Sequence, residues 1–263
     1  MAADKQTANA VGESVALRKA FAANGEVASA GEGTQMALSK KLGKVGAAAV
    51  SNYIMVGYDD LYSIQYFREN IRPYWNRKGD SSIQKQFALA AAEYEQLMKR
   101  CEKFDAQLMA DGLKAGGKEY AELLALAYRQ AITAHKLIET PNGDLAWLSK
   151  ENNSNGSIGT VDVTYPSAPM FLYYNPELAK GLLNFIFYYT ESGKWTKPFA
   201  AHDVGTYPLA NGQTYGGDMP VEECGNMLIL TGAICQAEGK ADYALKHWDA
   251  LTTWTDYLVE NGG

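Results

Sequence analysis

The feature that most constrains the fold is a long apolar stripe with helical spacing. From Ile83 through Leu97 to Leu108, apolar side chains recur every three or four residues, which places them on one face of an α-helix. The same spacing resumes from Tyr120 to Ala134, beyond the break in "KAGGK". A stripe of under five heptads that ends in a Gly-Gly break is typical of a packed bundle helix rather than a coiled coil. We therefore expect two antiparallel helices here.

Further helices are expected at about 166–174, 176–191, 220–236 and 241–260, and their connections are unequal. The connections at Asn175 and "EGKA" are short. Those at "TPNGDLAWLSKENNSNGSIGTVDVTYP" and "SGKWTKPFAAHDVGTYPLANGQTYGGDM" are long and polar. Structureless connections beyond roughly 15 residues are uncommon in compact domains unless they have a function. If the helix pairs stack side by side, both long connections lie on one face, where we expect the functional site.

The region before the helices has a period of two, which is typical of strands. It extends from Gly31 to about Tyr62, and its apolar positions fall into two groups. These groups are Met36, Leu38 and Leu42, and then Val50, Ile54, Val56 and Tyr58. We expect two strands, which need a larger sheet because an isolated pair is only marginally stable in water.

Charge and hydropathy exclude several partners. Asp and Glu number 30 against 24 Lys and Arg, for a formal net charge of -6, and the two signs are interspersed. This pattern argues against nucleic acid or an anionic membrane as a partner. No run approaches the roughly 18 apolar residues of a membrane span, and the start "MAADKQTANAVGES" lacks the features of a signal peptide.

The two long connections and the helix starts beside them carry the ionisable candidates. Asp162 precedes a helix and could be an acid, a base, a sugar-hydroxyl ligand or only a capping residue. His202 and Asp203 could bind a polar substrate or be solvated loop residues. Because they are adjacent in the chain, we expect them to form a hydrogen-bonded pair less easily than distant residues would.

Glu222 and Glu223 open a predicted helix, where the helix dipole favours acidic residues without any function. Successive helix positions point roughly 100° apart, so at most one of the two faces the site squarely. Asn226 can join either glutamate on one face. His135 and His247 are isolated on helices and are expected to be packing or surface residues. The spacing of His, Cys and acidic residues predicts no metal site, and we expect no cofactor.

Three long segments give the chain a specific resemblance. They are "NGSIGTVDVTYPSAPMFLYYNPELAKGLLNFIFYY", "GKWTKPFAAHDVGTYPLANGQTYGGDMPVEECGNMLIL" and "ADYALKHWDALTTWTDYLVENG". Together they resemble the six-helical-hairpin domain of the glutaminase A family, which is found in fungi and in gut-type Bacteroidetes. The resemblance begins at about Gly31 and is strongest between Ser149 and Gly262.

The resemblance implies a mainly α fold. It implies a β-sandwich-like domain followed by an (α/α)6 toroid of helical hairpins related to the six-hairpin glycosidases. Residues 1–62 would be the last piece of the sandwich with its linker, and residues 63–263 the first half of the toroid. We expect a fragment that lacks the remainder of its own toroid and that could oligomerise through its open edges. Family members are typically periplasmic or extracellular, which gives the expected location.

The expected site combines the family with the candidate residues. The expected catalytic residues are Asp162, Asp203, Glu222 and Glu223. The expected substrate contacts are Tyr165, Trp195, Lys197, His202, Tyr207, Gln213, Asp218 and Asn226. The substrate would be small and polar, either glutamine or a carbohydrate.

Three hypotheses for function remain open at this point. The family implies hydrolysis of L-glutamine to L-glutamate and ammonia. Amide hydrolysis usually needs an activated Ser, Thr or Cys, however, and no such motif organises the hydroxyls near Asp162. Carboxylates in two converging loops fit glycoside hydrolysis better. The truncation favours a catalytically silent binding fragment.

Overall fold

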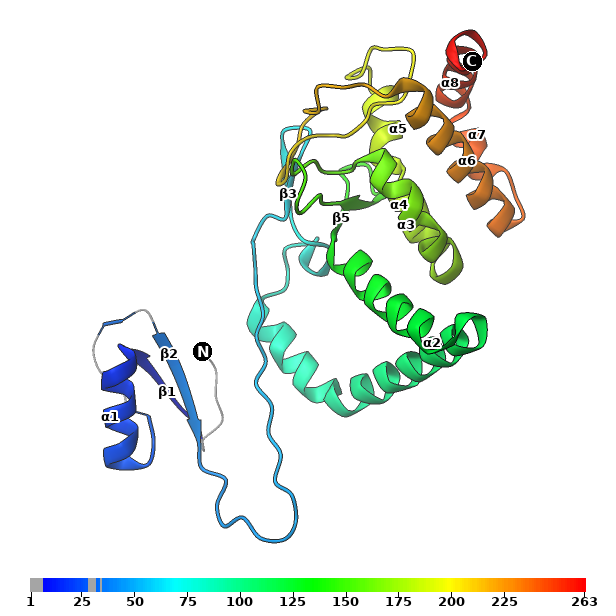
Figure 1. Cartoon of the computed structure of the whole chain (residues 1–263). Coiled ribbons are helices and arrows are strands. Elements are labelled where there is room, and N and C mark those ends of the chain that lie inside the picture. The colour runs from blue at the N-terminus through cyan, green and yellow to red at the C-terminus, as the bar shows by residue number, and fades with distance from the viewer. Residues whose placement is uncertain (1–6, 28–31, 34) are drawn as a thin grey trace. The chain divides into compact units, whose positions relative to one another are not determined.

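The computed structural model describes residues 7–27, 32–33 and 35–263 and divides into two compact units (Figure 1). The first unit comprises Met1–Gly57 and the second Tyr58–Gly263. Helices dominate the second unit, while the described residues of the first form one helix and two strands. The predicted fold class, mainly α with a few preceding strands, is confirmed. The assignment of residues 1–62 to a β-sandwich remnant and of 63–263 to the toroid stays a prediction.

The first unit is a small strand-helix-strand arrangement. Strands β1 (Thr7–Gly12) and β2 (Gln35–Lys40) pair antiparallel, and α1 (Ser14–Asn24) lies between them in sequence. Ala10, Leu17 and Val27 form its buried apolar cluster. Strand β2 confirms the first strand expected from the two-residue period, while Gly31, where that period begins, lies outside the described residues.

The second expected strand, over residues 50–58, is wrong. These residues are irregular, and Ile54, Val56 and Tyr58 are 71%, 77% and 88% exposed. A strand is held by a paired neighbour, and no described segment pairs with this one. Alternation of apolar and polar residues is therefore not sufficient to form a strand here.

Helix α2 (Ile83–Thr133) contains the apolar stripe and its break. Its N-cap, Ser82, accepts a hydrogen bond from the backbone N–H of Lys85. The helix is interrupted at Gly117, whose φ of 81° is left-handed, and the rings of Phe104 and Tyr128 meet across the turn with centroids 5.0 Å apart. The predicted division into two helices at the Gly-Gly break is confirmed, and Figure 1 shows the bend.

The other elements of the second unit follow in order. They are β3 (Ile64–Tyr66), β4 (Glu69–Ile71), the 3-10 helix η1 (Tyr74–Asn76), β5 (His135–Glu139), β6 (Leu145–Ser149), α3 (Val161–Tyr174), α4 (Pro176–Gly181), α5 (Asn184–Glu191), β7 (Leu209–Ala210), α6 (Pro220–Glu238), α7 (Asp242–Lys246) and α8 (Trp248–Asn261). The helices expected after residue 166 are all present, although two of them are each divided into two shorter helices.

Helix α3 begins five residues earlier than expected, at Val161 rather than near 166. Pro166 and Pro169 lie inside it, and proline is more common in the first turn of a helix than in its interior. The sequence therefore suggested a later start. The early start matters because it places Asp162 in the first helical turn.

Strands within the two long connections were missed. Strand β6, in the first connection, forms an antiparallel hairpin with β5, which directly precedes that connection, and Leu137 lies opposite Trp147. Strand β7 pairs parallel with β3, so that Ala210 lies opposite Tyr66. Both connections are thus anchored to a small amount of sheet rather than being structureless, which limits where their polar residues can go.

The core of the second unit lies among α3, α5, α6 and α8. Helix α3 packs against α6, and α8 packs against both α5 and α6. Phe187 stacks on the imidazole of His247, with centroids 3.9 Å apart, and on Trp254 at 5.3 Å. His247 is 3% exposed, which confirms that it is a packing residue. No helix in the described ranges is long and apolar enough to cross a membrane.

His135 gives the fold a pH dependence that can be measured. Burial, the largest cause, and the charge of Lys150 lower the pKa of His135 from 6.5 to about 4, against the opposing effect of its hydrogen bond to the Ala131 carbonyl. The unfolded chain binds this proton below about pH 6.5 and the folded chain only near pH 4, so stability is lost as pH falls between these values. We expect a loss of up to about 3 kcal/mol, at 1.36 kcal/mol for each unit of pKa.

The matched variant is His135→Phe, which keeps a ring against Trp147 but cannot be protonated. Urea unfolding at pH 7 and pH 4.5 would measure the free energy of unfolding of both proteins. The wild type should lose more stability than the variant over this range. Equal losses would show that His135 is not protonated on unfolding.

Candidate functional site

The two long connections lie against each other beside the start of α3. The N–H of Val161 donates to the carbonyl of His202 at 2.9 Å, and Ile158 exchanges two backbone hydrogen bonds with Val204 and Gly205. Gly205 is required here, because its φ is 143° and a Cβ would lie 2.0 Å from the carbonyl oxygen of Leu209. The prediction that the two long connections lie on the same face is confirmed, because they are joined by backbone hydrogen bonds. This arrangement places His202 beside α3.

Asp203 organises the second connection. Its side chain is fully buried and accepts hydrogen bonds from the backbone N–H groups of Gly205, Thr214 and Tyr215 at 2.8, 3.0 and 3.1 Å. Its Oδ2 atom also lies 3.0 Å from Nδ1 of His202. A carboxylate with this many donors is held in one orientation. Asp203 therefore closes the loop between residues 203 and 215.

His202 is fixed on three sides. Its Nδ1 pairs with Asp203, its ring stacks on Tyr215 with centroids 4.2 Å apart, and its backbone N–H donates to Oε1 of Gln213 at 2.8 Å. The expectation that adjacent residues pair less easily was wrong here, because the loop turns both side chains the same way. If Nδ1 carries the proton donated to Asp203, Nε2 is left as an acceptor.

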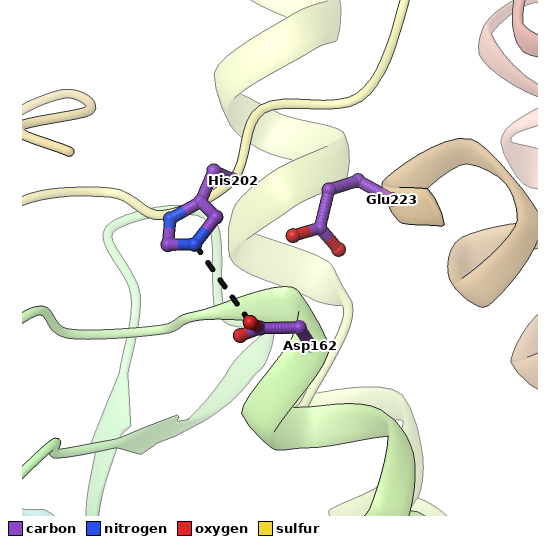
Figure 2. A group of neighbouring side chains, drawn as sticks. All are labelled: Asp162, His202 and Glu223. Carbon is purple, nitrogen blue, oxygen red and sulfur yellow. Dashed lines mark ion pairs between the residues drawn. The ribbon is translucent and has the colours of Figure 1, made fainter. Parts of the chain in front are cut away.

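Two carboxylates face that Nε2 atom, as Figure 2 shows. Asp162 comes from the first turn of α3 and Glu223 from the first turn of α6. Oδ2 of Asp162 lies 3.9 Å from Nε2 of His202. One donor atom from each of the three side chains lies within 4.8 Å of the other two. Residues far apart in sequence are thus gathered at one point by two helix starts and a loop.

Glu223 carries an unusual charge environment. It is fully buried, and burial followed by the negative charge of Asp162 raises its pKa to about 9. Glu222 and Asp203 add to the repulsion, while Nδ2 of Asn226 donates weakly to Oε2 at 3.4 Å. Oε1 has no hydrogen-bond partner among the described residues. Such an environment favours either a proton or another positive group beside this carboxylate.

Two other residues expected at the site, Asn226 and Glu222, differ in their position: the first is buried beside Glu223 and the second is exposed. Asn226 is buried and contacts Glu223, as its spacing predicted. Glu222 is exposed on α6 and outside the group of three. One glutamate of the pair faces the site, in agreement with the angular argument.

Lys197, Asp218 and Gln213 form a second polar group beside His202. The Lys197 ammonium contacts both carboxylate oxygens of Asp218 at 2.6 and 2.7 Å. Nε2 of Gln213 donates to Oδ1 of Asp218 at 3.0 Å, while its Oε1 accepts from the His202 backbone. Gln213 therefore links the charged pair to the histidine.

The three expected aromatic contacts are less closely tied to the site. The indole N–H of Trp195 donates to the Phe199 carbonyl, and its ring lies under the Lys197 ammonium at 5.0 Å. Tyr165 is 38% exposed and Tyr207 40% exposed, and neither has a described contact with Asp162, His202 or Glu223. Their role in substrate binding stays a prediction.

Two tyrosines support the site through contacts that the sequence did not predict. Tyr215 stacks on His202, and the hydroxyl of Tyr189 accepts from the backbone N–H of Gln213 at 3.2 Å. The only available signal was the density of aromatic residues. It could not say which rings meet, because the contacts join residues 13 and 24 positions apart.

The group of Asp162, His202 and Glu223 offers two carboxylate oxygens and one imidazole nitrogen to a ligand. The sequence predicted no metal site because no spacing motif links the three residues. The structure brings them together through the fold instead. They could act on a proton, a polar substrate or a metal ion.

The fold and site together define a class of protein: a domain of helical hairpins in which two helix starts and a long connection bring together two acidic residues and a histidine. The model of the "Glutaminase A six helical-hairpin domain" matches residues 117–263, and a "Domain of unknown function (DUF5127)" matches residues 1–111. The hairpin match covers more than half of the chain and contains the whole site. The chain belongs to the glutaminase A family.

Two fungal proteins are similar to the chain. A "Glutaminase A" of Aspergillus oryzae is 33% identical over 265 residues, which is 95% of this chain and 38% of that protein. A "Probable glutaminase" of Arthroderma benhamiae is 39% identical over 131 residues, or 49% of this chain and 15% of that protein. The chain thus spans well under half the length of either relative. No solved structure shows a significant match.

The anchoring role of Asp203 predicts a large effect of Asp203→Asn on stability. The amide NH2 would have to face a backbone donor or Nδ1 of His202, which leaves at least one buried donor unsatisfied. We expect a loss of about 2 kcal/mol or more in the free energy of unfolding. The control is Asp218→Asn, which alters a partly exposed ion pair and should lose about 1 kcal/mol at most. Similar losses in the two variants, measured by urea unfolding, would contradict the anchoring role.

Proposed function

We propose that this chain carries the hydrolytic centre of a glutaminase that converts L-glutamine to L-glutamate and ammonia. One observation carries the proposal: Asp162, His202 and Glu223 converge within 4.8 Å in a chain that belongs to the glutaminase A family. The substrate comes from the printed names of the two fungal relatives. The role of the chain in hydrolysis is therefore an inference from its site and its family.

The chemistry requires a nucleophile and proton transfer. A water oxygen bonds to the side-chain amide carbon of glutamine, the C–N bond breaks, and nitrogen leaves as ammonia after taking a proton from that water. The cluster consists of two carboxylates and an imidazole, all suited to hold water or move its protons. Attack by activated water is thus the simplest route, and it explains why no serine or cysteine motif is present.

The polar group beside the cluster suits the other end of glutamine. The substrate carries an α-carboxylate and an α-ammonium group, and Lys197 and Asp218 present the complementary charges. Gln213 connects that pair to His202, so both ends of one substrate could be held in a fixed relation. We propose Asn226, Tyr165 and Tyr207 as further contacts around the polar chain of the substrate, and Trp195 as support for Lys197.

Membership of the glutaminase A family supports a location of this protein outside the cytoplasm. Periplasmic or extracellular residence is proposed from the resemblance, together with glutamine as the small-molecule partner.

A second candidate is glycoside hydrolysis, and one observation favours it. Asp162 and Glu223 place two carboxylates close together on facing helix starts. A pair separated by about 5 Å is the arrangement that retaining glycosidases use for nucleophile and acid. The family names favour glutamine, and the carboxylates favour this alternative.

Ammonia release from L-glutamine tests the proposal directly, with release of reducing sugar from a glycan panel measured in parallel. We expect ammonia from the wild-type chain and at least a roughly 100-fold lower rate for Asp162→Asn and for Glu223→Gln, because each removes one member of the cluster. The matched control is Glu222→Gln, which makes the same chemical change one residue away at an exposed position.

Each outcome decides between hypotheses. Sugar release lost in the same two variants would replace the glutaminase by a glycosidase. No turnover of either substrate class would contradict a catalytic chain and favour the binding fragment. Ammonia release that survives both substitutions would show that the cluster is not the catalytic centre.

A further inference from the structure

We infer that Asp162, His202 and Glu223 bind a divalent transition-metal ion. The inference concerns binding, and only its catalytic consequence rests on the proposed function. Nothing in the sequence suggested such a site, because its three members come from different segments of the chain.

The geometry of the donor atoms fits a small cation. Atoms no more than 4.8 Å from one another all lie within about 2.8 Å of a common point. Bonds from zinc to carboxylate oxygen and imidazole nitrogen are about 2.0 to 2.2 Å long. Each donor atom therefore needs to move only about 0.6 Å toward the common point to reach the length of a bond to the metal. Asp162 has room to move because its side chain is 31% exposed.

A second, independent observation is the unsatisfied buried carboxyl. Glu223 is fully buried, and its Oε1 atom has no hydrogen-bond partner among the described residues. The side chain points toward Asp162 and His202 (Figure 2). Oδ1 of Asp162 is likewise buried without a partner. Buried carboxylates are normally paired or bound to a metal, so two unsatisfied oxygens at one point indicate a ligand.

His202 is held as metal-bound histidines commonly are. Its Nδ1 is paired with the buried carboxylate of Asp203, which leaves Nε2 facing the two acidic side chains. A histidine that ligates a metal usually donates its other ring N–H to a carboxylate or carbonyl, which fixes the orientation of the ring. Asp203 is in turn held by three backbone donors. The ring is therefore already positioned before any ion binds.

The charge around the cluster also favours a cation. The negative charges of Asp162, Glu222 and Asp203 all act on Glu223. No lysine or arginine is paired with Asp162 or Glu223 in the described part of the chain; the Lys197 ammonium pairs with Asp218 instead. A divalent ion would supply the missing positive charge at the point where three donors already meet.

The donor set indicates which ion to expect. Imidazole with two carboxylates suits zinc or manganese better than magnesium or calcium, which prefer oxygen ligands throughout. Three protein ligands leave an open coordination position, the arrangement of catalytic rather than structural zinc sites. In the proposed hydrolysis, an ion here would activate the attacking water or polarise the amide carbonyl.

Binding can be measured without any activity assay. The purified chain is treated with a chelator, dialysed, and titrated with Zn²⁺ or Mn²⁺ by calorimetry, with metal content determined by mass spectrometry. We expect one ion for each chain and a higher melting temperature when it is bound. Glu223→Gln and Asp162→Asn should each bind at least about 100-fold more weakly. Asp203→Asn should weaken binding roughly 10- to 100-fold, as loss of such a supporting carboxylate does elsewhere.

The control variant for the metal titration is Glu222→Gln. Glu222→Gln removes one of the charges that act on Glu223 but no donor atom. Because that charge is exposed and screened by solvent, the variant should bind within about threefold of wild type. Near-ultraviolet circular dichroism checks that each variant is folded. The inference is overturned if neither ion binds the wild type, or if Glu223→Gln and Asp162→Asn both bind as wild type does.

Failure of this inference and failure of the proposed function give different results. If protein treated with a chelator releases ammonia at the full rate and binds no ion, the glutaminase proposal is supported and the metal site is contradicted. If one ion binds through the three side chains but no ammonia forms, the metal site is supported and the glutaminase proposal is contradicted.

Discussion

The buried carboxylate of Asp203 is the interaction on which the site depends. By accepting hydrogen bonds from Gly205, Thr214 and Tyr215, it closes a long connection that has little secondary structure of its own. The same carboxylate holds His202 in position. Polar groups that are buried and fully satisfied can specify one conformation, which an apolar contact alone would not do at a loop. The rest of the site is then assembled around a fixed imidazole.

Two helix starts complete the arrangement, and they create an electrostatic problem. Asp162 and Glu223 each lie in a first turn, where the helix dipole favours an acidic side chain. The packing of α3 against α6 then brings both toward His202. The fold keeps two acidic groups close together with unsatisfied oxygens, and this combination is uncommon unless a site has a use for it.

Much of this could be predicted from the sequence, and the limits have physical causes. The apolar stripe on both sides of Gly117 defined two helices, and the long polar connections indicated the face of the site. The strand expected over 50–58 failed because a strand needs a partner that a local pattern cannot reveal. The pairing of His202 with Asp203 was missed because it depends on the backbone turn at Gly205. The group of three was missed because its members are joined only by tertiary packing.

The central claim is that Asp162 and Glu223 act as parts of one site. A double-mutant cycle on kcat/KM for glutamine hydrolysis tests it most directly, using Asp162→Asn, Glu223→Gln and the double variant. Residues that act as a unit are strongly non-additive, so the double variant should fall within about threefold of the slower single variant. If the fold-loss in kcat/KM of the double variant equals the product of the two single fold-losses, the two carboxylates act independently, which would contradict the account.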